Sequence, residues 1–251
     1  MKKERFWVPL SVIILWQVLS SCHVIPSYKL PSPIEIFLGF RDLLVVGVPP
    51  GHYLYLHIIY SLLRVALGYA AASLLAIPLG LFMGWSPELL RMVRPLVEVV
   101  RPIPPLAWIP IAIVWFGIGV KSAAFIIFLG AFFPILLNTI SGVTSINPIL
   151  VEAARTLHAK EKHIFLKVLF PGAVPSIFVG MRIGIGVGWM TLVAAEFTGV
   201  REGYGLGYMI MTARDIQRPD EILAGMLVIG IIGLLIDVGL RATESKAIRW
   251  K

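Results

Sequence analysis

Residues 58–84 read IIYSLLRVALGYAAASLLAIPLGLFMG, and Arg64 is the only charged side chain in this run. About 20 apolar residues suffice to carry a helix across the hydrocarbon core of a bilayer, so we expect one transmembrane helix here. The rest of the chain has the same character: of 251 residues 58% are hydrophobic and 14% are charged, and the mean hydropathy is +0.87. Water-soluble domains carry far more charge. The composition therefore predicts an all-α membrane protein.

Similar apolar runs recur along the chain and predict about six transmembrane helices in a single transmembrane domain, residues 1–251. The expected spans are residues 6–24, 58–84, 95–117, 122–142, 172–198 and 220–241. One long polar segment, residues 143–171, interrupts them between the fourth and fifth spans.

The net charge of +8 is explained by topology. Cytoplasmic segments of membrane proteins are enriched in Lys and Arg. With the N-terminus inside, the inner segments hold fourteen such residues and the outer segments hold six, so we expect both termini in the cytoplasm. The fourteen are Lys2, Lys3, Arg5, Arg91, Arg94, Arg101, Arg155, Lys160, Lys162, Lys167, Arg241, Lys246, Arg249 and Lys251. The six are Lys29, Arg41, Lys121, Arg201, Arg214 and Arg218, while Arg64 and Arg182 lie in or near the ends of spans.

Several function classes are disfavoured at this point. The basic excess needs no nucleic-acid partner once topology accounts for it. Cys22 is the only cysteine, which excludes an internal disulfide and a cysteine metal cluster. It follows Leu-Ser-Ser, as in a lipoprotein cleavage box, but removing the first span would leave an odd number of crossings. No Gly-x-x-x-x-Gly-Lys-Ser/Thr loop is present, so any ATP chemistry must come from a partner. We expect no cofactor.

The third expected span is rich in proline, with Pro102, Pro104, Pro105 and Pro110 in one crossing. Proline removes backbone donors, and irregular backbone within a membrane persists only beside other helices or a wet cavity. This favours a helix next to a pathway. The alternative is a proline-rich entry turn before an ordinary span, which leaves only Pro110 unexplained.

The fifth expected span carries Gly180, Gly184 and Gly188 at four-residue spacing, a ridge of small residues that lets another helix approach closely. Arg182 and Glu196 lie fourteen residues apart, about 21 Å along a helix, so they do not pair with each other. One interpretation places them at the inner and outer mouths of a polar path. The other is that they anchor the two ends of the span at the membrane interfaces.

The polar segment begins with Asn147 and Pro148, which predict a helix start, and a helix-forming stretch follows as far as His158. A second helix is expected over about 160–169, so His158 and Ala159 form a corner between two short cytoplasmic helices. Small Ala153 and Ala154 would let another protein approach, with Glu152 and Arg155 at the rim. The alternative is a surface connector held by a Glu152–Arg155 ion pair one turn apart.

These residues also carry a resemblance to a known family. "EAARTLHA" at 152–159 and "FLKVLFPGAVP" at 165–175 are similar to the EAA loop of inner-membrane permeases of binding-protein-dependent ABC importers. "RPIPPLAWIPIAIVWFGIG" at 101–119, "GAFFPILLNT" at 130–139, "VAAE" at 193–196 and "GLGYMI" at 205–210 resemble the branch that transports nitrate, sulfonates, taurine and bicarbonate.

The resemblance implies a permease subunit in the cell membrane that transports a small solute and hydrolyses nothing itself. It implies two copies of a separate ATPase, an external binding protein and a homodimer. Glu152, Ala153 and Ala154 would face the ATPase, while Leu157, Ala159 and residues 169–171 would hold the loop to the bundle. The family's usual glycine is His158 here, which puts the geometry of the corner in question. Otherwise His158 has a role of its own, as a helix cap or an ATPase contact.

Two other classes remain open from the residues alone. A self-contained ion-coupled carrier or channel would need ionisable groups within the membrane, and the candidates Arg64, Arg182, Glu196 and Asp237 all lie near span ends. A scaffold that only recruits an ATPase would not need spans interrupted by proline and glycine. The sequence does not identify the solute.

The orientation can be tested with Cys22, which we expect at the outer end of the first span. A membrane-impermeant thiol reagent applied to intact cells should label Cys22, or a cysteine introduced as Ser27→Cys. A Lys160→Cys variant should stay unlabelled until the cells are opened. Labelling at position 160 but not at position 27 would reverse the topology.

Overall fold

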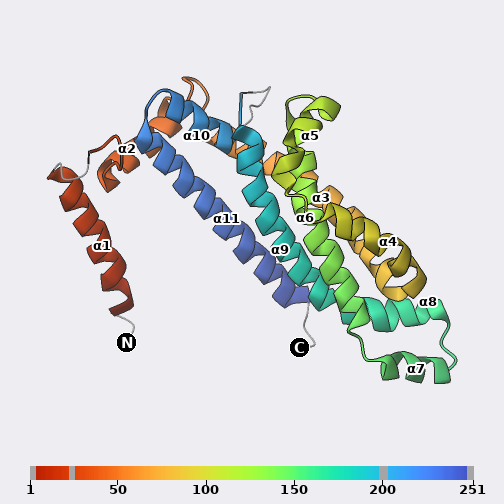
Figure 1. The fold of residues 1–251 in the computed structure, drawn as a ribbon. Helices are drawn as coiled ribbons and strands as arrows, with labels where there is room; N and C mark the ends of the chain where they lie inside the picture. Colours follow the sequence, from red (N-terminus) through yellow and green to blue (C-terminus); the bar gives the residue numbers. More distant parts are fainter. Residues whose placement is uncertain (1–3, 23–25, 198–202, 248–251) are drawn as a thin grey trace. The chain divides into compact units, whose positions relative to one another are not determined.

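The computed structural model describes residues 4–22, 26–197 and 203–247, and these ranges contain helices and connections but no strand. The expected span ends at 24 and 198 lie outside them. The helices are α1 (Glu4–Ser21), α2 (Pro33–Val45), α3 (Leu54–Trp85), α4 (Pro87–Val100), α5 (Ile109–Phe116), α6 (Val120–Thr144), α7 (Pro148–Thr156), α8 (Glu161–Ile164), α9 (Phe170–Phe197), α10 (Leu206–Asp215) and α11 (Pro219–Ala247), drawn in Figure 1.

The chain forms two compact units. The first unit comprises Met1–Leu62 and Glu196–Ile232, and the second comprises Leu63–Ala195 and Gly233–Lys251. The first unit therefore contains α1, α2 and α10, and the second contains α4 to α8. Each unit is described by itself below.

Four helical stretches are long and apolar enough to cross a membrane: Leu54–Trp85, Val120–Thr144, Glu161–Phe197 and Pro219–Lys246. They contain the spans expected at 58–84, 122–142 and 220–241, and the described part of the span at 172–198. The apolar part of α1, Leu10–Ser21, is shorter than these. The all-α membrane fold is thus confirmed.

The span expected over 95–117 needs correction, because it is not one straight helix. Pro87–Val100 and Pro105–Phe116 are inclined by 81° to one another, and only as a bent pair do they add a fifth span. The break falls at residues 101–104, where prolines remove the N–H groups that a continuing helix needs. Pro110 lies in the first turn of α5, after a 3₁₀ turn over Pro105–Trp108, where a missing N–H costs nothing.

In the second unit, α6 packs between α3 and α9 through glycines. A side chain on Gly80 of α3 would come within 2.7 Å of Thr139 on α6, and one on Gly84 within 2.6 Å of Val143. Ala72, Ala76, Ile135 and Leu136 are fully buried along the same contact. Small residues that allow close backbone approach are the usual means of holding helices together in lipid.

In the first unit, α2 begins with a capping box. The Ser32 hydroxyl accepts a hydrogen bond from the Glu35 N–H at 3.2 Å, and the Glu35 carboxylate accepts one from the Ser32 N–H at 2.6 Å. Pro33 occupies the first turn. Gly39 then brings α2 against the start of α11, where an added side chain would lie 2.9 Å from the Asp220 backbone.

Candidate functional site

The loop between α6 and α9 holds the residues expected to contact a partner. Asn147 caps α7 by accepting a hydrogen bond from the Ile149 N–H at 3.0 Å, and Pro148 starts the helix. Glu152, Ala153, Ala154 and Arg155 all lie on α7. Figure 1 shows α7 and α8 at the end of the second unit, where α6 ends and α9 begins.

One face of α7 is apolar and exposed. Ile149 is 66% exposed, Leu150 56% and Leu157 83%, and exposed Ala153 lies between them at helical spacing. Glu152 borders this face. Nothing in the second unit covers it among the described residues.

Leu157 was expected to hold the loop to the bundle, and its exposure corrects that expectation. It ends α7 immediately before the corner, where its side chain faces away from the bundle core. The loop is instead attached through partly buried Val151 and Phe165 and buried Leu169, which pack on Val143 and Ala173. Leu169 therefore matches its expected role, and Ala159 is half-buried.

The ion pair within the loop also differs from the expected one. Arg155 Nε donates to Glu161 Oε1 at 3.2 Å, across the corner, and not to Glu152 one turn away. The pair closes the corner and leaves the Glu152 carboxylate exposed.

The corner itself is a Schellman motif, the common way of ending a helix with a left-handed residue. The Ala159 N–H bonds to the Ala154 carbonyl at 3.0 Å, and the His158 N–H bonds to the Arg155 carbonyl at 2.9 Å. His158 has φ 57°, in the left-handed region that glycine reaches most easily. The position therefore needs a left-handed residue, as the family's usual glycine indicated.

After the corner, the loop does not form a second separate helix. α8 continues through a π-helical turn, Phe165–Leu169, directly into α9, so that Glu161–Phe197 is one helical stretch of 37 residues. Pro171 and Pro175 lie near the start of α9, and Pro175 is inside the helix, where it leaves the Pro171 carbonyl without its usual backbone partner. The second helical segment, expected over about 160–169, is thus present as α8 and the π-helical turn, and it continues into the span without a break.

The residues expected to shape a pathway are distributed over α5 and α9. Gly180, Gly184 and Gly188 all face α6, and an added side chain at Gly184 would lie 3.0 Å from the Ala131 carbonyl. Arg182 pairs with Glu244 near the end of α11, with Nη1 and Oε2 3.4 Å apart. Arg182 and Glu196 do not meet, as their spacing requires.

Glu196 is fully buried in the first unit. Its carboxylate accepts hydrogen bonds from the Ser61 hydroxyl at 2.8 Å and from the Gly207 N–H at 2.8 Å. The Ser61 oxygen accepts in turn from the Leu206 N–H at 2.9 Å. A carboxylate at the N-terminus of α10 satisfies donors that the helix leaves free. Ser61 was not predicted as a site residue. The one feature of the sequence that pointed to a polar partner was Glu196 itself, a carboxylate within an apolar span.

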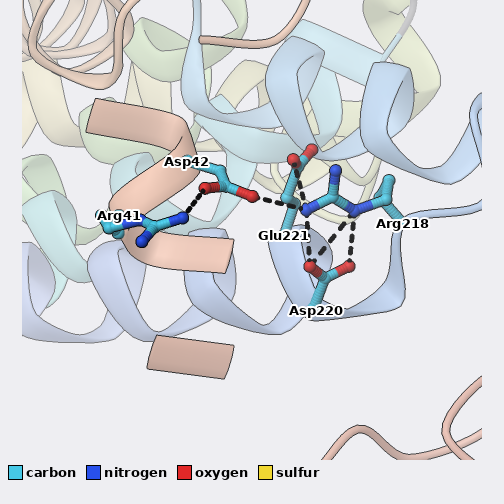
Figure 2. A network of polar contacts seen from close by, with 5 residues as sticks. All are labelled: Arg41, Asp42, Arg218, Asp220 and Glu221. Atoms are coloured by element: carbon cyan, nitrogen blue, oxygen red, sulfur yellow. Dashed lines mark hydrogen bonds and ion pairs between the residues drawn. The ribbon is translucent and has the colours of Figure 1, made fainter. Parts of the chain in front are cut away.

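A second polar network joins α2 to the start of α11 in the first unit (Figure 2). Arg218 lies 3.1 Å from Asp42, 2.7 Å from Asp220 and 3.0 Å from Glu221. Arg41 contacts the other oxygen of Asp42 at 3.2 Å. Glu221 is only 2% exposed, so Arg218 neutralises a buried carboxylate. This network could not be predicted from the sequence, because Asp42 and Arg218 are 176 residues apart.

Hydrogen bonds in the first unit lower the pKa of two half-buried carboxyl groups, Asp42 and Glu35. Hydrogen bonds from Arg218 and then from Arg41 hold the pKa of Asp42 below its ordinary value of 3.8. A hydrogen bond from the Ser32 N–H likewise lowers the pKa of Glu35. Among the described residues no cluster of three His, Cys, Asp or Glu side chains could hold a metal ion.

A short helix with an exposed apolar face, placed beside a bundle of apolar helices, characterises a membrane subunit that binds a second protein. The sequence pattern of the binding-protein-dependent transport system inner membrane component matches residues 76–242. The chain belongs to this family of ABC importer permeases. ATP hydrolysis in such systems resides on a separate ATPase subunit, and the permeases also work with substrate-binding proteins. A self-contained carrier is thereby excluded.

Relatives of similar length support this assignment. A putative ABC transporter permease of Methanocaldococcus jannaschii is 42% identical, over 97% of this chain and 90% of its own. The taurine transport system permease of Escherichia coli is 37% identical, over 95% and 86%. Other relatives are named as permeases for aliphatic sulfonates, nitrate and bicarbonate. The MetNI methionine ABC transporter in an inward-facing conformation shares the fold, with a TM-score of 0.66 at 21% identity over 76% of this chain and 94% of that one.

The Schellman corner predicts the effect of replacing His158. Because a left-handed histidine is strained, His158→Gly should leave the stability unchanged or raise it by up to about 1 kcal/mol, although glycine also frees the unfolded chain. His163→Gly is the matched control, since His163 is exposed within α8. That change should cost about 0.5–1 kcal/mol. Thermal unfolding of the purified permease measures both, and a large loss for His158→Gly would show that the histidine makes stabilising contacts of its own.

The Arg218 network predicts unequal roles for its two arginines. Arg218→Gln leaves Glu221 buried without its counter-charge and should destabilise the protein by ~1–3 kcal/mol. Arg41→Gln removes an exposed contact to the same Asp42 and should cost at most about 1 kcal/mol. Thermal unfolding at pH 7 compares the two variants. Equal losses of stability would contradict the prediction that Arg218 contributes more than Arg41.

The contact between Arg41 and Asp42 also makes the stability of the protein depend on pH. Because the pKa of Asp42 is lowered in the folded protein, its contribution is complete above its ordinary value of 3.8 and is lost as the pH falls through the folded value. The stability difference between wild type and Arg41→Gln should therefore shrink below about pH 3.8. A difference that persists unchanged at lower pH would show that Asp42 is not responsible.

Proposed function

We propose that two copies of this chain form the translocation path of an ATP-driven importer for a small oxyanionic solute, and that α7 of each copy is the docking element for one ATPase subunit. The observation that carries the docking role is the exposed apolar face of α7, formed by Ile149, Leu150, Ala153 and Leu157. Exposed apolar surface bordered by charge is typical of a site that another protein covers.

The contacts suit a cleft on the partner. Ala153 lies centrally on the face and has the smallest side chain there, so the partner can approach the backbone of α7 closely. Leu157 then inserts beside it, and Glu152 supplies a charge at the rim for a charge-assisted hydrogen bond. Arg155 is committed to Glu161 and positions the corner.

The proposed mechanism needs a bundle with two arrangements and a partner that favours one of them. Closure of the two ATPase subunits on ATP would displace α7. Because α7 joins α6 and α8 continues into α9, the displacement reaches two long helices of the second unit directly. The path would then open alternately to the two sides of the membrane.

Taurine, aliphatic sulfonates, nitrate and bicarbonate, named for the relatives, all present an oxyanion group. We therefore assign this chain a solute of that class, delivered by an external binding protein. We assign both termini to the cytoplasm, on the same side as α7, from the distribution of Lys and Arg.

The docking role is tested by Ala153→Trp. An indole on the centre of the α7 face should overpack the partner's cleft at a cost of ~1–3 kcal/mol, weakening ATPase binding roughly 5- to 150-fold. Co-purification with the cognate ATPase and stimulated ATP hydrolysis should both fall, while insertion into the membrane is unchanged.

Lys162→Trp is the matched control, because it adds the same ring to an exposed residue of α8 outside the α7 face. It should retain ATPase binding. If α7 instead lies on the lipid surface, Ala153→Trp will be tolerated, since indole favours that interface. Retained ATPase stimulation by Ala153→Trp would exclude the docking role.

A further inference from the structure

The break between α4 and α5 borders a cavity of about 390 Å³ in the second unit. Its walls include the polar side chains of Arg101 and Asn138 and the aromatic rings of Trp108 and Phe133, and Ile103 and Gly130 also line it. α6 supplies Gly130, Phe133 and Asn138, while Arg101 immediately follows α4.

The cavity lies alongside the body of an apolar helix. Asn138 is six residues before the end of α6 at Thr144, about 9 Å along the helix, and Gly130 is about 21 Å from that end. α6 has a mean hydropathy of 2.2 over its most apolar window. Arg101 was counted among the cytoplasmic cations, and it lines this cavity together with Asn138. An arginine that borders a cavity between apolar helices is typical of a solute path.

The guanidinium of Arg101 is not neutralised by the protein around it. Glu98, the nearest acidic residue in sequence, pairs with Arg94 at 2.7 Å. Within the residues that the structure describes, no ion pair joins Arg101 to a carboxylate. Arg101 is exposed and lines the cavity.

The backbone around the cavity also favours a wet site. Pro134 lacks the N–H that would bond to the Gly130 carbonyl in a regular helix, and Pro105, which also lines the cavity, has no N–H either. Backbone groups freed within a membrane persist where they line a water-filled cavity. Asn138 uses one N–H for the Pro134 carbonyl, at 2.8 Å, and keeps its second.

We propose that this cavity is a station on the solute path that binds the oxyanion group of the solute, with Arg101 as the residue that selects for negative charge. The planar guanidinium matches the paired oxygens of a sulfonate, nitrate or bicarbonate, Asn138 adds a neutral donor, and Trp108 and Phe133 accommodate an apolar remainder. This inference rests on the proposed function, because the residue acts on the solute of that same path.

The test uses the charge preference of a thiol placed in the cavity. Ile103→Cys, at a position 40% exposed, is made in a Cys22→Ser background, so the full-length permease carries one cysteine. Its reaction rates with anionic sulfonatoethyl and cationic trimethylammonioethyl methanethiosulfonate are measured in detergent. Relative to 2-mercaptoethanol in the same buffer, we expect a preference for the anionic reagent on the order of tenfold.

Variants of Arg101 test whether this residue causes the preference for the anionic reagent. Arg101→Gln should remove most of it, and Arg101→Lys should keep it. Arg94→Gln, which removes an exposed charge already paired on the same helix, should leave it unchanged. Ethanesulfonate or nitrate should slow the anionic reagent more than chloride at equal ionic strength.

An unchanged preference in Arg101→Gln would overturn the assignment, and equal protection by chloride would overturn the oxyanion specificity. If Arg101→Gln is not recovered as a folded protein, the Ile103→Cys variant alone tests the proposal. The proposal is then refuted if its ratio of anionic to cationic reaction rates equals the ratio for 2-mercaptoethanol. The measurement needs neither ATPase nor binding protein. A negative result here would refute the oxyanion site, whereas retained ATPase stimulation by Ala153→Trp would refute the docking role, so the two failures are distinguishable.

Discussion

The close approach of α3 and α9 to α6 is the constraint on which the second unit depends. Helices in lipid gain little from the hydrophobic effect when they associate, because lipid tails are as apolar as leucine. What remains is contact at short range, and the glycines of α3 and α9 provide it along the length of α6. The same contact fixes the walls of the Arg101 cavity and the spacing of the two helix ends that carry α7 and α8. Packing in the middle of the helices thus determines the geometry of both functional regions.

Three arginines show how the surroundings, and not the residue type, determine a charge's role. Arg182 meets one carboxylate, Glu244, and Arg218 meets three, of which Glu221 is buried. These two join helices within their own units. Arg101 has no such partner among the described residues and borders a cavity. In the sequence all three are single basic residues at or near the ends of apolar runs, and nothing local separates them.

The sequence was most informative where the relevant physics is local. Apolar length predicted the long helices, and the signature Asn-Pro predicted the start of α7, because caps involve neighbours within a few residues. The resemblance at His158 indicated a left-handed corner, which the Schellman bonds explain. Pairing over long distances was not accessible, as Asp42 with Arg218 and Glu196 with Ser61 illustrate. The 81° break was missed because an apolar run records hydrophobicity but not direction, although its prolines were visible.

The helix that runs from Glu161 to Phe197 has a mechanical consequence. Its 37 residues are helical throughout and α8 is inclined to α9 (Figure 1), so a force applied near the α7–α8 corner reaches α9 through a bent arm without a flexible connection. Such an arm can turn α9 about its own axis as well as shift it, whereas a flexible linker would dissipate both. The π-helical turn over Phe165–Leu169 is the one described place in this stretch where the hydrogen-bond register shifts, and a local change of register there rotates everything beyond it. Torsion of a single helix is thus available to the protein as a signal, alongside any tilting of the bundle.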